Sequence, residues 1–477
     1  MRRRVLFVIV AIALLCCVLG ALVACESYKT TPLDKVGDPT ATVESNGGLV
    51  VKQGGYLYFV NGYTGYLTEN GKDNWFGNVV KGAIVRVTYN EDKTLGDDAV
   101  VVVPKSVMAS SANVGFSIFG EYIYYVSPSA VEDRAGKVQT DTLQFMRTKI
   151  DRTGTEVILN IEGNTSVDYK YTSTALIHYD SSDKILYSKD LTKKSFKESD
   201  KGTVIAEDVA SVHFPKNDSY APATPTTAAD YVFYTKSSED AYEYGNTLYV
   251  ASPDGSVNKA VIGPDTFDEK YSISIVASDV EDGKVTIYYT KTAYIGTSSS
   301  GTVEGTYAYT FTDASFTFNK AQEVKLTSDS LSSVFPAGSD LGLIVYGSST
   351  NTIRYDKDGE LHTYGELQMS TLVAVEDGYF YYVNGDSKLL AFAMSDDENA
   401  KFAYDGDDKV MTSFTGAEYF DGYLYFIVDD DYDYVSRLKV STISVTDPSS
   451  VEYDRIGIVT DADQEKIKAA EEKKDED

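Results

Sequence analysis

The hexapeptide Gly378-Tyr379-Phe380-Tyr381-Tyr382-Val383 decides the fold, because versions of it return along most of the chain. Aromatic and β-branched residues in a short run favour a β-strand. Close versions are Gly55-Tyr56-Leu57-Tyr58-Phe59-Val60, Glu121-Tyr122-Ile123-Tyr124-Tyr125-Val126, Asp230-Tyr231-Val232-Phe233-Tyr234-Thr235, Val285-Thr286-Ile287-Tyr288-Tyr289-Thr290 and Gly422-Tyr423-Leu424-Tyr425-Phe426-Ile427. Weaker ones are Lys184-Ile185-Leu186-Tyr187 and Leu343-Ile344-Val345-Tyr346. From position 58 to position 425 there are seven steps of about 52 residues on average, the mark of an internal repeat.

Each repeat carries the pattern of four short strands, which is clearest around the quoted hexapeptide. Strands are expected at residues 372–375, 379–383, 389–394 and from 401 onward, with a hairpin turn at Asn384-Gly385-Asp386. Repeated four-stranded units predict an all-β fold, a single β-propeller of four-stranded blades over residues 43–460. We predict eight blades. Seven is the alternative, because the third and sixth units are degenerate, and a two-sheet sandwich array is the other architecture compatible with these strands.

The N-terminus indicates export and lipid anchoring. Three arginines follow Met1, and residues 5–24 carry no charge, the pattern of a secretory signal. The run ends in Leu22-Val23-Ala24-Cys25, which resembles the lipobox of bacterial lipoproteins. That resemblance implies cleavage after Ala24 and a diacylglyceryl group on Cys25, and two acyl chains anchor a protein stably. The alternative is an uncleaved signal anchor. Both place the domain at the cell membrane, on its extracytoplasmic face.

The remaining segments complete the predicted organisation. Residues 1–24 are the signal peptide, residues 25–42 the lipidated Cys with a flexible tether, and residues 461–477 an acidic tail, either a frayed helix or disordered. Residues 215–230 interrupt the fourth unit and are expected to form an exposed loop. The tyrosine-rich runs resemble those of uncharacterised β-propeller domains in exported bacterial lipoproteins, and this resemblance implies no activity.

Composition restricts the partners. The chain has 72 acidic and 43 basic residues and a net charge of −29, which repels phosphate backbones, so no nucleic-acid partner is expected. Of three cysteines, Cys16 and Cys17 lie in the predicted signal peptide, and Cys25 is taken by lipid. The mature domain is therefore expected to have no disulfide and no thiolate chemistry.

Motifs for catalysis or cofactor binding are missing from the sequence. The three histidines, His178, His213 and His362, have no metal-ligand spacing, and His178 lies in a strand-like run where a structural role is expected. No nucleophile elbow, phosphate-binding loop or dinucleotide motif occurs, so we predict no enzyme activity and no cofactor. An acidic hairpin turn in the last unit supplies candidate Ca²⁺ ligands at Asp429, Asp431 and Asp433, without the alternating spacing of a calcium loop.

Three functions fit these features. The first is a binding or scaffolding module, whose rim loops contact an unknown protein, peptide or glycan near the membrane. The second is an enzyme of the glycosidase or lyase type, which acts on an extracellular polymer with carboxylates at the channel mouth. The third is a surface spacer. We expect the first.

Overall fold

A computed structural model describes the chain in the following ranges. They are residues 28–63, 75–107, 115–129, 142–163, 167–216, 219–222, 227–236, 246–263, 270–294, 301–328, 330–331, 333–336, 343–346, 351–355, 361–366, 369–376, 379–393, 401–402, 409–410, 417–429, 434–443 and 453–474.

Within these ranges the strands form eight antiparallel sheets in chain order. The first sheet contains β15 (Ser219–Tyr220), β1 (Val43–Glu44), β2 (Val50–Gln53), β3 (Tyr56–Val60), β4 (Ile84–Thr88) and β5 (Val100–Val103). The second contains β6 (Ser117–Phe119), β7 (Tyr122–Pro128), β8 (Leu143–Lys149) and β9 (Glu156–Ile161). The third contains β10 (Asp168–Tyr171), β11 (Ala175–Asp180), β12 (Ile185–Asp190) and β13 (Thr203–Ala206). The fourth contains β14 (Val209–His213), β16 (Val232–Lys236), β17 (Leu248–Ala251) and β18 (Asn258–Ile262).

The C-terminal half continues the series. The fifth sheet contains β19 (Lys270–Glu281), β20 (Lys284–Tyr294), β21 (Thr302–Phe311) and β22 (Val324–Thr327). The sixth contains β23 (Ser333–Pro336), β24 (Leu343–Tyr346), β25 (Asn351–Tyr355) and β26 (Leu361–Glu366). The seventh contains β27 (Met369–Glu376), β28 (Tyr379–Asn384), β29 (Leu389–Ala393) and β30 (Lys401–Phe402). The last contains β31 (Lys409–Val410), β32 (Ala417–Phe420), β33 (Tyr423–Asp429), β34 (Val435–Lys439) and β35 (Tyr453–Arg455). Short 3₁₀ turns are η2 (Ala228–Asp230), η3 (Lys320–Gln322) and η4 (Val440–Thr442), and the helix α3 spans Asp461–Lys474.

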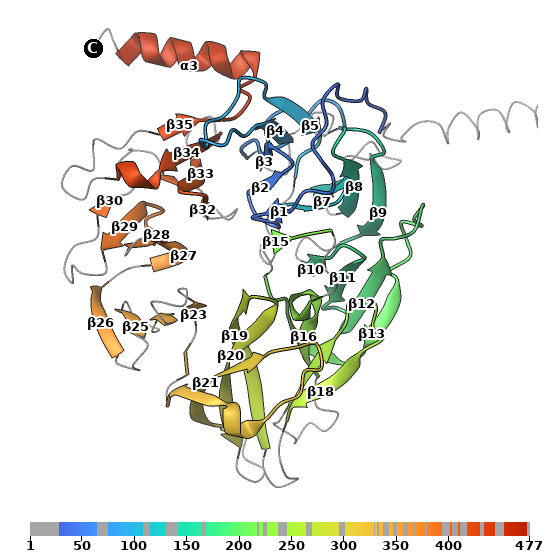
Figure 1. Cartoon of the computed structure of the whole chain (residues 1–477), viewed down its shortest axis with the longest axis vertical. Coiled ribbons are helices and arrows are strands. Elements are labelled where there is room, and N and C mark those ends of the chain that lie inside the picture. Colours follow the sequence, from blue (N-terminus) through green and yellow to red (C-terminus); the bar gives the residue numbers. More distant parts are fainter. Residues whose placement is uncertain are drawn as a thin grey trace, which may run out of the picture.

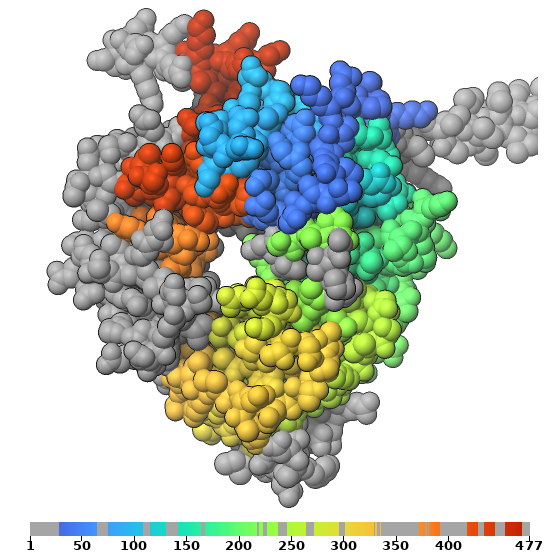
Figure 2. All heavy atoms as spheres, viewed as in Figure 1, coloured from blue at the N-terminus to red at the C-terminus, as the bar shows by residue number. Residues whose placement is uncertain are grey.

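The sheets stand around a common centre, with the last beside the first (Figure 1). Figure 2 shows a hollow at this centre, with the first sheet in blue on one side and the fifth in yellow on the other. This arrangement is a single β-propeller with four-stranded blades, as the repeat predicted, and the sandwich alternative is wrong. The aromatic run forms the second strand of each four-stranded unit except the third, with β3 second in the unit β2 to β5 and β33 second in the unit β32 to β35. In the third unit Ile185-Leu186-Tyr187 of the run lies on the third strand, β12, with Lys184 in the preceding turn, and the second strand is β11.

A buried cation explains much of the tyrosine repeat. In the first sheet Arg86 on β4 pairs across the strands with Tyr58, and its guanidinium lies 4.2 Å from the ring centre of Tyr56. Arg147 and Arg437 repeat this geometry over the first tyrosine of their own sheets, at 4.3 and 4.5 Å. A desolvated guanidinium over an aromatic face is stabilised by about 2 kcal/mol, so the first tyrosine of the run supports the cation and the second packs beside it.

Polar side chains join the last sheet to the first. None of the described C-terminal strands pairs within the first sheet, so side-chain contacts are what link the two ends of the ring. The Glu418 carboxylate, on β32, accepts hydrogen bonds from the backbone N–H groups of Leu49 at 2.6 Å and Val50 at 3.0 Å. It also accepts one from the Ser45 hydroxyl at 2.6 Å. Phe420 and Tyr425 extend one continuous apolar core from the last sheet into the first. The ring is therefore closed by packing and charge-assisted hydrogen bonds.

The segment predicted as a flexible tether lies against the propeller from Tyr28 onward. The Tyr28 ring packs edge-on against Phe76 with centroids 5.4 Å apart, and Leu33 N donates to Asp151 O at 3.0 Å. The Arg86 guanidinium donates to the Lys35 carbonyl. Apolar contacts and backbone pairing thus hold in place the part of this segment from Tyr28 onward, which the sequence predicted to be flexible.

The loop predicted at residues 215–230 is also more ordered than expected. Its residues Ser219 and Tyr220 form β15, which pairs antiparallel with β1 and so extends the first sheet from a segment of the fourth unit. The Tyr220 ring packs edge-on against Phe119 at 5.0 Å. Backbone pairing and ring burial hold this part of the loop on the inner side of the ring (Figure 1).

The C-terminal segment forms α3 over Asp461–Lys474, which agrees with the helical form of the predicted tail. Tyr434 fastens its first turn, because the phenol donates to the Asp463 carboxylate at 2.9 Å. In the described part of the chain, no helix has the length and apolar character needed to span a membrane.

Candidate functional site: a rim groove and a central cavity

A groove of about 810 Å³ lies between the third and fourth sheets, where turns from both converge. Its size is within the range of small-molecule and oligomer sites. It is lined by Thr174, Ala175, Ser188, Lys189, Asp190, Thr192, Lys193, Asp200, Gly202, Thr203, Tyr231, Ser252, Pro253, Asp254 and Ser256. Hydroxyl groups and charges of both signs predominate, so the groove suits a polar ligand.

The turns of this rim groove are ordered by their own aspartates. The Asp190 carboxylate accepts from the hydroxyl and the backbone N–H of Thr192, at 2.6 and 2.9 Å, which lowers the pKa of Asp190. Asp254 likewise accepts from the Ser252 hydroxyl at 2.6 Å and from Ser256, and these bonds lower its pKa. Each carboxylate is therefore ionised and committed to its turn, which preorganises the groove.

Two buried basic side chains donate hydrogen bonds to backbone carbonyls around the same groove. The Lys189 ammonium donates to the carbonyls of Lys197, at 2.9 Å, and Asp200, and burial lowers the pKa of Lys189. From the neighbouring sheet, the Arg147 guanidinium donates to the carbonyls of Leu191 at 3.0 Å and Lys193 at 3.2 Å. Arg147, a residue of the second sheet, thus binds the backbone of a rim turn of the third sheet.

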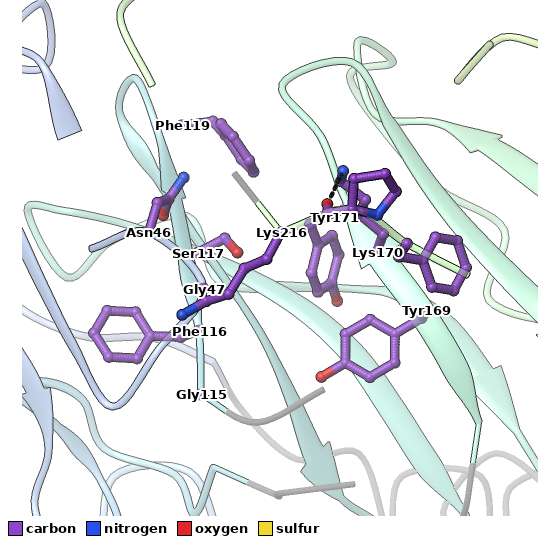
Figure 3. Close-up of a pocket in the computed structure, with 12 residues that line it drawn as sticks. Asn46, Gly47, Gly115, Phe116, Ser117, Phe119, Tyr169, Lys170, Tyr171 and Lys216 are labelled. Carbon is purple, nitrogen blue, oxygen red and sulfur yellow. Dashed lines mark hydrogen bonds between the residues drawn. The ribbon is translucent and has the colours of Figure 1, made fainter. Parts of the chain in front are cut away.

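A smaller cavity of about 100 Å³ opens among the first four sheets (Figure 3). It is lined by Asn46, Gly47, Gly115, Phe116, Ser117, Phe119, Tyr169, Lys170, Tyr171, Phe214, Pro215 and Lys216. Figure 3 shows Tyr169 on one side and Phe116 on the other, with the Lys216 side chain reaching between them. The cavity therefore combines aromatic walls with two lysines.

Lys170 fastens both ends of the loop that carries β15. Its ammonium donates to Pro215 O at 2.7 Å and to Ala229 O. Burial lowers the pKa of Lys170 to about 8, against the opposing effect of the Asp230 carboxylate. The Asp230 carboxylate in turn accepts from the backbone N–H of Thr227 at 2.7 Å.

His178 is a core residue on β11, as its strand-like surroundings predicted. It is fully buried, its Nε2 is bonded to Lys201 O at 2.9 Å, and its ring stacks on Tyr187 at 5.2 Å. Burial lowers the pKa of His178 to about 4. His178 is the third paired residue of β11 after the turn from β10, as Tyr58 is the third paired residue of β3 after the turn from β2. Because a histidine stands where most other units have a tyrosine, the sequence pattern assigned the aromatic run of this unit to the wrong strand.

The other predicted positions are scattered or lie outside the described ranges. His213 ends β14 and is bonded to the Ser278 hydroxyl at 2.8 Å, and burial lowers its pKa to about 4. His362 is on β26, apart from both. Cys25, Asp431 and Asp433 lie outside the described residues, and of Asp429 only the backbone, at the end of β33, is described. Among the described side chains, no three His, Cys, Asp or Glu gather as a metal site would require.

Sequence reasoning missed both the groove and the cavity. Their residues come from turns and inner strands of different repeats, and no local motif links them. One signal was available: an arginine in the middle of the third strand, at Arg86, Arg147 and Arg437, recurs at a position expected to be apolar.

Comparison with known proteins identifies no family for this chain. No family model matches the chain, and no curated protein matches it. Among solved structures, apo AztD from Citrobacter koseri is 10% identical with a TM-score of 0.37, over 76% of this chain and 91% of that one. The β-propeller domain of the Trilobed protease from Pyrococcus furiosus is 13% identical with a TM-score of 0.37, over 74% and 98%. One of two prolyl endopeptidases is 13% identical with a TM-score of 0.42, over 84% and 54%. Identities this low leave activity, ligand and partner open.

Proposed function

We propose that this chain is a lipoprotein anchored through Cys25 to the extracytoplasmic face of the cell membrane, where its propeller serves as a binding or scaffolding module. The observation that carries the binding role is the rim groove, whose turns are ordered before any ligand arrives. Preordered turns lower the entropy lost on binding, and loops on a rigid scaffold are where proteins commonly place recognition.

The partner is a protein, peptide or glycan of polar character. The groove offers hydroxyls from both sheets and a lysine, Lys193, beside committed carboxylates. Such a lining suits backbone amides or sugar hydroxyls better than an apolar surface. The net charge of −29 opposes nucleic acid, whose phosphates the chain would repel.

We infer that the module acts by binding and not by catalysis. Both histidines with described side chains, His178 and His213, are desolvated, have a pKa lowered to about 4 and are already hydrogen-bonded. The groove carboxylates are ionised and held in turns, whereas a general acid needs a carboxyl that stays protonated near neutral pH.

Crosslinking and co-purification from membranes test the binding role. The groove variant combines Lys193→Glu, which reverses the charge of one of the two lining lysines, with Ser256→Arg, whose long side chain fills the groove. Lys194→Glu is the matched control, because Lys194 adjoins Lys193 but does not line the groove. We expect one or a few partners to be lost from the groove variant and kept by the control. Equal recovery from all three proteins would reject the rim groove as the binding site.

Cys25→Ala tests the anchor separately. Under the proposal, this variant leaves the membrane fraction or retains its unprocessed N-terminus, and metabolic labelling with a fatty acid is lost. Recovery of lipid label in Cys25→Ala would contradict the assignment. Recovery in the membrane with residues 1–24 still attached and no lipid in either protein would favour the signal anchor.

We further infer that each sheet is one blade, which makes the ring eight-bladed. The seven-bladed alternative would need two of these sheets to share one blade position. Two-dimensional class averages from cryo-electron microscopy of the purified protein, viewed down the ring axis, distinguish the two blade counts directly.

A further inference from the structure

The three aspartates of the rim groove are committed to their turns through one oxygen only. Asp190, Asp200 and Asp254 accept every side-chain hydrogen bond that the structure gives them at Oδ1. Within the described residues, the second oxygen of each, Oδ2, has no hydrogen bond or ion pair. Because the bonds inside the turns lower the pKa of all three, each Oδ2 is a charged acceptor that a ligand can use.

Tyr231 supplies a free donor in the same groove. The residue is only 8% exposed, and its ring packs against Phe316 with centroids 4.7 Å apart. Its hydroxyl has no hydrogen-bond partner in the part of the chain that the structure describes. Burial, and after it the carboxylates of Asp254 and Asp230, raises the pKa of Tyr231, so the phenol keeps its proton. A buried hydroxyl without a partner costs free energy, which a ligand oxygen in the groove would recover.

The repeat departs from its own pattern at this tyrosine. In the first, second and last sheets an arginine lies opposite the second aromatic of the run and over the ring of the first. In the fourth sheet Val250 stands opposite Phe233, and among the described residues no cation lies over Tyr231. Tyr231 therefore supports no buried cation, and it lines the groove instead.

Unused groups lie on both walls of the groove. On the wall from the fourth sheet, Asp254 is close enough to Tyr231 for its charge to act on the phenol, so an acceptor and a donor are neighbours there. On the wall from the third sheet, the Lys193 charge adds to the turn hydrogen bonds in lowering the pKa of Asp190 and Asp200. Lys193 itself forms no hydrogen bond or ion pair through its ammonium within the described residues. Each wall thus offers acceptors beside a donor.

This combination favours sugar hydroxyls over a peptide or a charged ligand. A sugar hydroxyl both donates and accepts, so neighbouring hydroxyls of one ring match a neighbouring carboxylate and phenol. The backbone N–H groups of Thr192, Gly202 and Ser256, with which a peptide could pair, are already bonded to the aspartates. Three aspartates and two lysines line the groove, so its charges nearly cancel, and neither a strongly acidic nor a strongly basic ligand is favoured.

We propose that the rim groove binds a neutral oligosaccharide, whose hydroxyls donate to the free Oδ2 atoms of its aspartates and accept from the Tyr231 hydroxyl. This assignment rests on the proposed function and names the partner class for the same site. The groove volume of about 810 Å³ is near the upper end for ligand sites, which suits a short oligomer better than a single sugar ring.

Calorimetric titration of the full-length protein, in a detergent without a sugar headgroup, tests the proposal. The neutral probes are maltotriose, cellotriose, mannotriose and triacetylchitotriose, and the charged probes are trigalacturonate and trilysine. We expect saturable binding of at least one neutral trisaccharide and weaker binding of both charged probes. Trilysine that binds more tightly than every neutral sugar would overturn the proposal in favour of a basic peptide.

Two nearly isosteric variants show whether the sugar binds at these groups. Asp254→Asn keeps Oδ1 for the turn and puts an N–H donor in place of the free oxygen, so affinity should fall at least about tenfold. Tyr231→Phe keeps the ring and removes the hydroxyl, which should cost about fivefold. The matched controls are Asp92→Asn, in a turn of the same kind in the first sheet, and Tyr56→Phe, at the first tyrosine of that sheet. Both should bind as the natural chain does.

The proposal is overturned if no neutral trisaccharide gives saturable binding, or if both groove variants bind like their controls. The crosslinking experiment keeps this outcome separate from the fate of the proposed function. Partners lost from the variant with Lys193→Glu and Ser256→Arg, together with no sugar binding, would retain the groove as a binding site and reject the neutral oligosaccharide.

Discussion

Asn61 and Ile458 exchange two hydrogen bonds across the seam of the ring. The Asn61 Nδ2 donates to Ile458 O at 2.8 Å, and Ile458 N donates to the Asn61 Oδ1 at 2.8 Å. The side-chain amide thus takes the place of a backbone peptide group in a neighbouring strand. Asn46 makes the same exchange with Ile118, and Asn246 makes it with Ile273, in each case between adjacent sheets. An asparagine that imitates a strand is a recurrent link between blades of this propeller.

Asn61→Asp should therefore destabilise the ring. The carboxylate cannot donate, so Ile458 O and Val80 O, which Asn61 Nδ2 also contacts, lose their partner in a fully buried position. We expect a loss of about 2–3 kcal/mol in the free energy of unfolding, measured in urea. Asn90→Asp at an exposed turn is the control and should stay within about 0.5 kcal/mol. Equal stability of the two variants would show that the seam does not depend on this amide.

The second seam contact pairs Glu418 with a glycine. A Cβ on Gly48 would lie 2.1 Å from the Glu418 Oε1, so Gly48→Ala must displace the carboxylate from the N–H groups of Leu49 and Val50. Glu418→Gln removes the charge from the same bonds. We expect each change to cost about 2–3 kcal/mol in urea unfolding and the double variant to cost little more than one, because both break the same contact. Additive losses would place the effect of Gly48→Ala elsewhere.

Arg147 links fold and function, because it supports the rim turn from the next sheet. Arg147 is only 4% exposed, and its guanidinium donates to the Glu156 carboxylate at 2.7 Å in addition to the carbonyls of Leu191 and Lys193. Arg147→Met should lower the free energy of unfolding by about 2–4 kcal/mol and speed amide exchange at Thr192 and Gly202. Arg147→Lys keeps the charge without the fork and should fall between the two. Unchanged exchange at these amides would separate Arg147 from the groove.

The sequence predicted the propeller because its signals are local. A run of aromatic and β-branched residues followed by a turn specifies a strand wherever it occurs, and β3, β7, β28 and β33 lie where those runs stand. The seam, the inner strand β15 and the central cavity could not be predicted in this way. Glu418 contacts Leu49 across a sequence separation of 369 positions, and β15 contains only two residues. Such contacts arise only when the ring closes and leave no periodic trace.

His178 should make the protein less stable in mild acid. Burial lowers its folded-state pKa from 6.5 to about 4, so between these values the unfolded chain binds the proton that the folded chain refuses. The contribution is complete above pH 6.5 and is lost as the pH falls toward 4, about 3 kcal/mol in all. Urea unfolding at pH 7, 6, 5 and 4 measures it. His178→Gln, which can still bond Lys201 O, should show a shallower fall with pH, and parallel curves would assign the acid sensitivity to other groups.

The short span between the proposed anchor and the first packed residue should orient the domain on the membrane. Only Glu26 and Ser27 separate Cys25 from Tyr28, which packs on Phe76, so the lipidated residue stays within roughly 10 Å of that contact. A fluorophore on Lys29→Cys should be quenched strongly by a headgroup-borne quencher, and one on Lys284→Cys, at the start of β20 in the fifth sheet, only weakly. With Cys25 acylated, each variant has a single free thiol. Twelve Gly and Ser residues inserted after Ser27 should abolish the difference, because a flexible chain of that length lets the propeller turn freely. Equal quenching at both positions without the insertion would mean that the Tyr28 contact does not hold the domain against the bilayer.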